Sequence, residues 1–300
     1  NRLREKYPES SEMGGERVYK PGFPLPKRSL GQNFLVHQGT IETIVELSGI
    51  QPGDRVVELG AGLGAMTGEL SKKASRVIGL EIDERLIKWV REKRPLAGNV
   101  ELRHSDILRV SFQGLAEEMG GTLKIIGNLP YNISSQVVFK LIEERNYINR
   151  ATLMFQKEVA ERLVSRPGSK AYGILSVVTG YCADVTRLMD IPPGLFRPRP
   201  KVTSTLVQME FREPVIVATD FAFFKNIVRQ AFQKRRKKLI NALKGLASFS
   251  QDEILHALEV CGIDPGYRAE VLSTENFVTL SNTLVHTISS GNNTQLDITH

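Results

Sequence analysis

Hydrophobic residues recur with two alternating spacings along residues 41–155. Ile41, Ile44 and Val45 follow the spacing of a helix, and the apolar run Arg55–Leu59 follows that of a buried strand. This alternation continues down the chain. It predicts strands at 55–59, 76–81, 100–103, 123–127 and 151–155, with helices at about 41–48, 64–73, 84–94 and 134–143. Strands separated by helices predict an α/β fold with a parallel sheet and right-handed crossovers.

The pattern changes after residue 180. Extended segments at 184–189 and 203–211 flank the proline-rich stretch 192–200, which predicts a hairpin-like addition at the sheet edge. After Pro214 no further strand is predicted, and three helices are expected at 221–243, 251–261 and 274–289. We therefore divide the chain into four parts: a disordered tail (1–26), an α/β domain (27–212), a helical domain (213–290) and a disordered tail (291–300).

Composition narrows the class of protein. The chain has 300 residues, of which 41% are hydrophobic and 24% charged, as in an ordinary soluble globular protein. We find no run of the ~20 apolar residues that a membrane span needs. Cys182 and Cys261 stand alone, without metal-ligand spacing. We expect neither a metal nor a disulfide, and a cytoplasmic location.

Basic residues are concentrated in the helical half. The formal net charge is +7, and residues 225–244 hold eight basic side chains and no acid. The densest part is Lys234, Arg235, Arg236, Lys237 and Lys238, within a helical pattern. Such segregation predicts a helix that contacts nucleic-acid phosphates. A solvated helix face is the alternative interpretation.

Glycines and acids follow the first three predicted strands. Gly60 and Gly62 come directly after the first strand, Glu81 ends the second, and Asp106 follows the third. The carboxyl ends of parallel strands meet at one edge of a sheet, where ligands bind. Glu81 is suited to accept hydrogen bonds from ribose hydroxyls, and Asp106 from an adenine amino group. A nucleoside-containing cofactor is predicted, while the alternative is that both acids merely cap helices.

The fourth strand ends in Asn128-Leu129-Pro130-Tyr131. The tetrapeptide resembles a motif of amino-methyltransferases, and this resemblance implies an aromatic amine such as adenine N6 as the acceptor. Such an amine is a poor nucleophile, because its lone pair is delocalised into the ring. Oxygen acceptors aimed at its hydrogens favour a pyramidal nitrogen, and the Asn128 amide and the Leu129 carbonyl offer two. Pro130 would fix the turn and Tyr131 would stack on the base. A plain turn before the next helix is the alternative.

This tetrapeptide resembles the [Asn/Asp/Ser]-Pro-Pro-[Tyr/Phe] motif of amino-methyltransferases, in the form found in the ribosomal RNA adenine N6,N6-dimethyltransferases. Two further segments resemble that family, Gly31-Gln32-Asn33-Phe34-Leu35 and the Phe-x-Pro-x-Pro-Lys-Val-x-Ser segment at 196–204. The resemblance covers about residues 27–285. It implies a class I (Rossmann-like) S-adenosylmethionine-dependent methyltransferase sheet of seven mostly parallel strands, followed by a small all-α C-terminal domain.

The resemblance also implies roles for particular residues. The cofactor would contact Asn33, Leu35, Gly60, Gly62, Glu81, Ile82, Asp106 and Asn128. The target adenine would lie against Asn128, Leu129, Pro130 and Tyr131, with Phe196 on its second face. The implied activity is dimethylation of two adjacent adenosines near the 3′ end of small-subunit (16S) ribosomal RNA, by a monomer that acts on that RNA or on the immature small subunit.

Three other functions remain open at this point. A large-subunit (23S) ribosomal RNA adenine methyltransferase shares the acceptor motif, although the fuller C-terminal domain disfavours it. A ribosome-assembly factor with secondary methylation would use the same basic helix. A nicotinamide-dependent dehydrogenase rests on the glycine loop alone, and no proton-transfer residue can be nominated for it.

Overall fold

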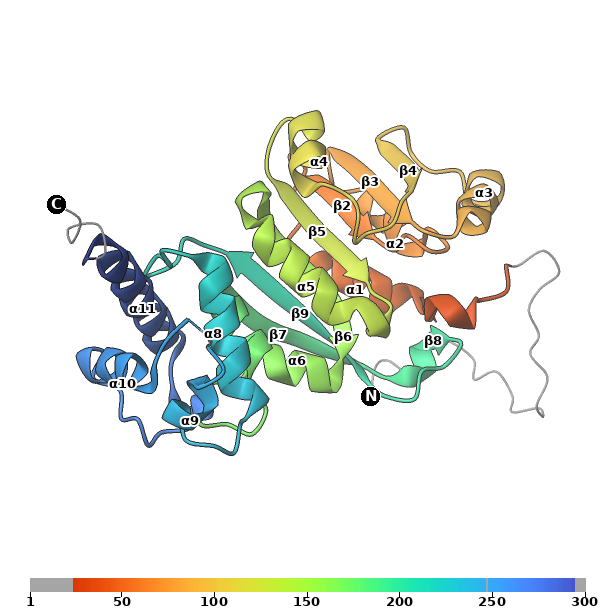
Figure 1. The fold of residues 1–300 in the computed structure, drawn as a ribbon. Coiled ribbons are helices and arrows are strands. Elements are labelled where there is room, and N and C mark those ends of the chain that lie inside the picture. The colour runs from red at the N-terminus through yellow and green to blue at the C-terminus, as the bar shows by residue number, and fades with distance from the viewer. Residues whose placement is uncertain (1–23, 247, 295–300) are drawn as a thin grey trace.

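The computed structural model describes residues 24–246 and 248–294, so most of both predicted tails lies outside the described residues. A seven-stranded sheet forms its centre (Figure 1), in the order β4-β3-β2-β5-β6-β9-β7. Its strands are β2 (Arg55–Leu59), β3 (Arg76–Glu81), β4 (Val100–His104), β5 (Leu123–Asn128), β6 (Ile148–Gln156), β7 (Ala183–Ile191) and β9 (Ser204–Phe211). Strands β2 to β6 pair in parallel, whereas β9 runs antiparallel to β6 and β7. The predicted sheet class and edge hairpin are confirmed.

Helices cover both faces of this sheet. They are α1 (Gln38–Leu47), α2 (Ala65–Leu70), α3 (Glu84–Lys93), α4 (Phe112–Met119), α5 (Ser134–Glu143), α6 (Lys157–Leu163) and α7 (Ile174–Gly180). Neighbouring residues of β2 point to opposite faces: Val56 packs with α1 and α2, and Val57 packs with α4 and α5. Because both faces are covered, the strands read as continuous apolar runs.

The last strand ends at Phe211, and only helices follow among the described residues. These are α8 (Phe221–Gln233), α9 (Leu239–Leu243), α10 (Gln251–Val260) and α11 (Thr274–Thr294). Their core is continuous with that of the sheet, since the Phe224 ring lies 5.2 Å from the ring of Tyr181, just after α7. Helix α11 runs four residues past the predicted boundary at 290.

The prediction of one helix over 221–243 is wrong. The chain forms α8 and α9, and the basic run Lys234–Lys238 is the turn between them. Five consecutive cations have no acid within reach at helical spacing, so a helix would hold like charges on one face. The amide N–H groups of Leu239 and Ile240 instead lie near the carbonyls of Tyr267 and Pro265, the first at 2.6 Å. The basic surface is therefore a turn, not a helix.

A two-stranded sheet not predicted from the sequence joins the N-terminal segment to the proline-rich loop. Strand β1 (Phe34–Leu35) pairs antiparallel with β8 (Phe196–Arg197). Phe34 lies opposite Arg197, and Leu35 lies opposite Phe196. The segments 31–35 and 196–204, which both resemble the dimethyltransferase family, are thus neighbours in space.

Candidate active site

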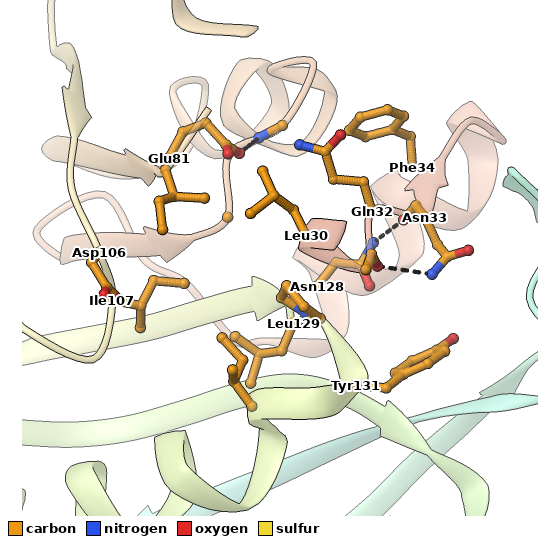
Figure 2. Close-up of a pocket in the computed structure, with 16 residues that line it drawn as sticks. Leu30, Gln32, Asn33, Phe34, Glu81, Asp106, Ile107, Asn128, Leu129 and Tyr131 are labelled. Carbon is orange, nitrogen blue, oxygen red and sulfur yellow. Dashed lines mark hydrogen bonds between the residues drawn. The ribbon is translucent and has the colours of Figure 1, made fainter. Parts of the chain in front are cut away.

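A cavity of about 670 Å³, counted with the solvent at its mouth, opens at the carboxyl ends of the parallel strands (Figure 2). Its lining is Leu30, Gly31, Gln32, Asn33, Phe34, Gly60, Gly62, Glu81, Ile82, Asp106, Ile107, Asn128, Leu129, Pro130, Tyr131 and Ile133. All the predicted cofactor and acceptor residues lie here except Leu35 and Phe196.

The glycine loop between β2 and α2 requires backbone angles that other residues rarely adopt. Gly60 and Gly62 have φ of +77° and +54°. A Cβ atom on Gly62 would also lie 3.3 Å from the Phe34 ring. Glycine is needed here both for the turn and for the close approach of β1.

Glu81 fixes this loop with its carboxylate. One of its oxygens accepts a hydrogen bond from the Gly62 amide at 2.8 Å, and the other accepts one from the Asp83 amide at 2.8 Å. Burial raises the pKa of Glu81 above its usual value. Each oxygen keeps a second lone pair for a ligand hydroxyl. The N-cap of α3 is Asp83, so Glu81 is not simply a helix cap.

Asp106 and Ile82 form the far wall. The Asp106 carboxylate accepts a hydrogen bond from the Leu108 amide at 2.9 Å, so it does cap a turn, yet its side chain remains 36% exposed beside the cavity. Ile82 is a large apolar side chain with 45% of its surface exposed. Together with Leu30 and Ile107 it provides an apolar slot suited to a flat aromatic ring.

The N-terminal segment 27–33 supplies residues 30–33 to the cavity lining and is tied to Asp83. The Asp83 side chain accepts hydrogen bonds from Arg85, from Gln32 at 3.3 Å and from Lys27 at 3.4 Å. These donors hold the pKa of Asp83 well below its usual range, with Arg85 as the largest cause. Nothing in the sequence pattern indicated this contact, because the partners lie more than 50 residues apart.

Asn128 is held by its amide nitrogen. That nitrogen donates to the backbone carbonyl of Asn33 at 2.8 Å. The amide oxygen accepts no hydrogen bond from the residues that the structure describes, and Asn128 lines the cavity. The side chain is therefore fixed with its acceptor oxygen available to an incoming amine.

Tyr131 lies beside Asn128 with its ring at the cavity wall (Figure 2). Its hydroxyl lies 2.7 Å from the hydroxyl of Ser204, at the start of β9. Burial raises the pKa of the Tyr131 hydroxyl. This anchor sets the ring orientation before a base arrives. Ser204 belongs to the quoted 196–204 segment, but its role could not be assigned from sequence.

A smaller cavity adjoins the first and shares Phe34, Gly60, Gly62 and Asn128 with it. Leu35 lines this second cavity, as does Glu58, which the sequence analysis did not nominate. Burial raises the pKa of Glu58 to about 8, opposed by a hydrogen bond from the Thr67 hydroxyl. A carboxylate inside the apolar strand Val-Val-Glu-Leu was the signal that could have revealed it.

The structure does not place Phe196 at the site. Its side chain is fully buried and packs in the cluster that contains Leu35, Ile41 and Leu206. The pairing of β8 with β1 turns the ring into this core instead of toward the cavity. The expected cover for the second face of the base is therefore not provided by Phe196 in this conformation.

The five cations of the basic turn differ in exposure and in their partners. Lys234, Arg236, Lys237 and Lys238 are exposed. Arg235 donates to the Glu270 carboxylate at 2.8 Å and to the Ser169 carbonyl at 3.3 Å. Four of the five predicted RNA-binding cations thus face solvent, and the fifth is engaged in packing.

The charged and polar groups that line the cavity fit a cationic nucleoside cofactor better than a dinucleotide. Its lining holds two carboxylates, Glu81 and Asp106, and none of the lining residues is lysine, arginine or histidine. The Gly62 amide, which would face a pyrophosphate in a dinucleotide site, is bound to Glu81. Fold and site together define a class I methyltransferase that acts on an aromatic amine. Among the described residues there is no group of metal-binding side chains and no helix long and apolar enough to cross a membrane.

Comparisons with known proteins agree with this class. The family model of ribosomal RNA adenine dimethylases matches residues 25–286. The ribosomal RNA small subunit methyltransferase A of Desulfotalea psychrophila is 41% identical over 266 residues, covering 85% of this chain and 90% of the relative. That of Geobacter metallireducens is 40% identical over 262 residues, covering 86% and 95%.

Two solved structures cover nearly the same length. A dimethyladenosine transferase from Plasmodium falciparum has a TM-score of 0.73 at 28% identity and covers 86% of this chain and 98% of that one. The 23S rRNA methyltransferase ErmE has a TM-score of 0.64 at 27% identity and covers 84% and 99%. The chain belongs to the ribosomal RNA adenine dimethylase family. It is an S-adenosylmethionine-dependent methyltransferase.

Proposed function

We propose that this protein dimethylates N6 of two adjacent adenosines near the 3′ end of small-subunit ribosomal RNA. The relatives at about 40% identity are named small-subunit methyltransferases, and they match along nearly their whole length. The structural likeness to ErmE shows that a large-subunit enzyme shares the architecture, so the fold alone does not choose between the two RNAs. With a ribosomal substrate, we expect the protein in the cytoplasm, acting as a monomer on the RNA or the immature subunit.

The observation that carries the proposed chemistry is the orientation of Asn128. Its amide nitrogen is engaged by the Asn33 carbonyl, so its oxygen is the atom offered to the cavity. An acceptor at that point can bind one N6 hydrogen, and the adjacent Leu129 carbonyl can bind the other. Both favour a pyramidal nitrogen whose lone pair is free to attack. Preorganised acceptors of this kind cost little reorganisation during the reaction.

The remaining residues position the reactants. Tyr131, anchored through Ser204, gives the base a stacking face worth ~1–3 kcal/mol. Glu81 and Asp106 would hold the ribose and adenine of S-adenosylmethionine, with the Gly60–Gly62 backbone and Leu35 beside its methionine end. When bound, that cofactor supplies a methyl group on a sulfonium, already a strong electrophile. The protein therefore needs alignment more than acid–base groups.

The exposed cations of the turn at 234–238 would bind phosphates of the folded RNA. Contacts of this type position a substrate without reading its bases. Choice of the target would then depend on RNA shape and on the pocket, which accepts a base only when it is flipped out of its stack.

Mass spectrometry of small-subunit RNA from cells with and without this protein tests the proposal. We expect dimethyladenosine at two adjacent positions near the 3′ end only when the protein is present. An identical modification pattern in the two strains, or a loss of methyl groups confined to large-subunit RNA, would refute it.

A further inference from the structure

The proline-rich loop 197–203 is attached at each end to a residue that lines the cavity. At its start, Arg197 pairs with the cavity residue Phe34 across β1 and β8. At its end, the Ser204 hydroxyl lies 2.7 Å from that of Tyr131. The six residues 198–203 therefore connect two points that are each in contact with a residue of the cavity lining.

This loop is held firmly along its length. Its first residue is fixed by the β1–β8 pairing, and Pro200 in its middle is buried. Its last residue, Thr203, accepts a hydrogen bond from the Lys157 amide at 3.0 Å. Side chains that project from this loop are thus presented on a fixed backbone, which lowers the entropy lost on binding.

Two cations on the loop have no protein partner. Arg199 and Lys201 are exposed, and neither forms an ion pair or side-chain hydrogen bond with the residues that the structure describes. Arg197 differs, because its guanidinium folds back onto the carbonyls of Gly194 and Phe196 at 3.0 and 2.9 Å. Residues 192–204 contain no acid.

The nearest acid on the adjoining strand is already engaged. Asp190 on β7 pairs with Arg187, and it accepts a hydrogen bond from the Thr205 hydroxyl at 2.7 Å. These contacts hold the pKa of Asp190 below its usual value, with Thr205 as the largest cause. Glu158 is exposed on α6 beside Lys157. Neither carboxylate neutralises the loop.

We propose that Arg199 and Lys201 bind the phosphates that flank the target adenosine and hold its backbone while the base lies against Tyr131. The inference rests on the proposed RNA substrate, and it adds a contact at the rim that is separate from the turn at 234–238. A flipped nucleotide leaves its own phosphates at the mouth of the pocket, where cations fixed on a rigid loop can meet them.

A synthetic RNA hairpin with two adjacent adenosines in its loop provides the test. Binding of the Arg199→Gln/Lys201→Gln variant is compared with that of the unaltered protein across salt concentrations. Since each phosphate contact to single-stranded RNA contributes about −0.7 to the slope of log K against log salt, we expect the slope to become shallower by roughly 1.4. Affinity for S-adenosylmethionine and the melting temperature should not change.

Uncharged phosphate analogues in the RNA show which phosphates the two cations contact. Replacing the phosphates on either side of the target adenosines with methylphosphonates should weaken binding by the unaltered protein but not weaken it further in the double variant. Lys73→Gln is the matched control. Lys73 is exposed and precedes the amino end of β3, whereas the cavity lies at the carboxyl ends of the parallel strands. The exchange Arg199→Lys/Lys201→Arg should restore the salt slope.

An unchanged salt slope in the glutamine variant, or equal sensitivity to methylphosphonates in both proteins, would overturn the inference. So would a charge-preserving exchange that behaves like the glutamine variant, because it would indicate a role in folding of the loop. Methyl transfer is measured separately, on immature small subunits: if none is transferred there, the proposed function fails, while the comparison of slopes still decides the role of the loop.

Discussion

Two buried carboxylates, Glu81 in the larger cavity and Glu58 in the smaller one beside it, have different partners. Glu81 accepts two backbone N–H groups, whereas Glu58 accepts only the Thr67 hydroxyl. Hydrogen bonds from the backbone stabilise the charged form, and burial favours the neutral form. The two glutamates therefore differ in their chemistry. Glu81 is suited to accept hydrogen bonds from a ligand, whereas Glu58 is protonated at neutral pH.

We expect Glu81→Ala to raise the dissociation constant for S-adenosylmethionine at least tenfold. The substitution removes the proposed acceptors for the ribose hydroxyls and also releases the Gly62 amide that Glu81 holds. Isothermal titration calorimetry measures the constant, with Glu84→Ala as the control because Glu84 is exposed in the first turn of α3. Equal affinity in the Glu81 variant and the unaltered protein would show that the carboxylate does not hold the cofactor.

Stability should depend on pH through Glu58. The pKa of Glu58 is raised from 4.5, the ordinary value of a glutamate, to about 8 in the folded protein, so the folded state binds more protons between these pH values. The free energy of unfolding should then fall as pH rises from about 4.5 to 8, by at most about 1.4 kcal/mol per pH unit. Urea unfolding across this range should show a flatter profile for Glu58→Gln. Parallel profiles for the two proteins would exclude this titration.

At the level of elements, the site is assembled by segments that cross the sheet edge. The N-terminal segment 27–33 joins Asp83 on one side and Asn128 on the other. Two methyl transfers to one nitrogen require that spent cofactor leaves between steps. Because this segment forms part of the cavity lining, its contacts with Asp83 should influence how fast that exchange occurs.

Lys27→Ala should therefore speed release of S-adenosylmethionine about two- to five-fold. Lys27 does not line the cavity, and its ion pair with Asp83 at 3.4 Å is partly exposed, so an effect below ~1 kcal/mol is expected. Stopped-flow displacement gives the rate. Lys88→Ala, which removes an exposed ion pair with Glu84 on α3, should leave it unchanged. A release rate equal to that of the unaltered protein would mean that this contact does not restrain the segment.

Local patterns were sufficient to predict the parallel sheet but not the smaller elements. Strands β2 and β3 begin and end where predicted, because each is an apolar run bounded by glycine, proline or charge. Strands β1 and β8 have two residues each and exist through long-range pairing, which no local pattern reveals. The same applies to the break between α8 and α9, where the first amides of α9 contact the carbonyls of Pro265 and Tyr267.

The site was predictable where a motif places a residue at a strand end. Asn128, Glu81 and Asp106 lie in one cavity because parallel strands bring their carboxyl ends together. Phe196 was misplaced because its orientation depends on the β1–β8 pairing. The roles of Glu58, Asp83 and Ser204 require knowledge of burial and of partners distant in sequence, so they emerged only from the structure.

On the scale of the whole molecule, the basic turn 234–238 is joined to the α/β domain through Arg235. Its guanidinium contacts Glu270 and the Ser169 carbonyl, and the Gly168 amide donates to the Glu270 carbonyl at 2.7 Å. These contacts fix the turn relative to the loop that follows α6. The distance between this basic turn and the pocket is thereby set by the fold.

Neighbouring arginines should consequently have different functions. Arg235→Ala should lower the free energy of unfolding by about 1 kcal/mol, with little change in the salt dependence of RNA binding. Arg236→Ala should leave stability unchanged and make the salt slope shallower by about 1. Denaturant titration and RNA binding at several salt concentrations measure both quantities. The reverse assignment of effects would contradict this division.

The most direct test of the account is methyl transfer by Asn128→Ala under single-turnover conditions, with cofactor affinity measured in parallel. We predict that transfer to RNA falls at least a hundredfold while S-adenosylmethionine still binds, and that Asn132→Ala, an exposed residue of the same turn, retains activity. Full methylation by Asn128→Ala would contradict the assignment of this amide as the acceptor that activates the adenine amine.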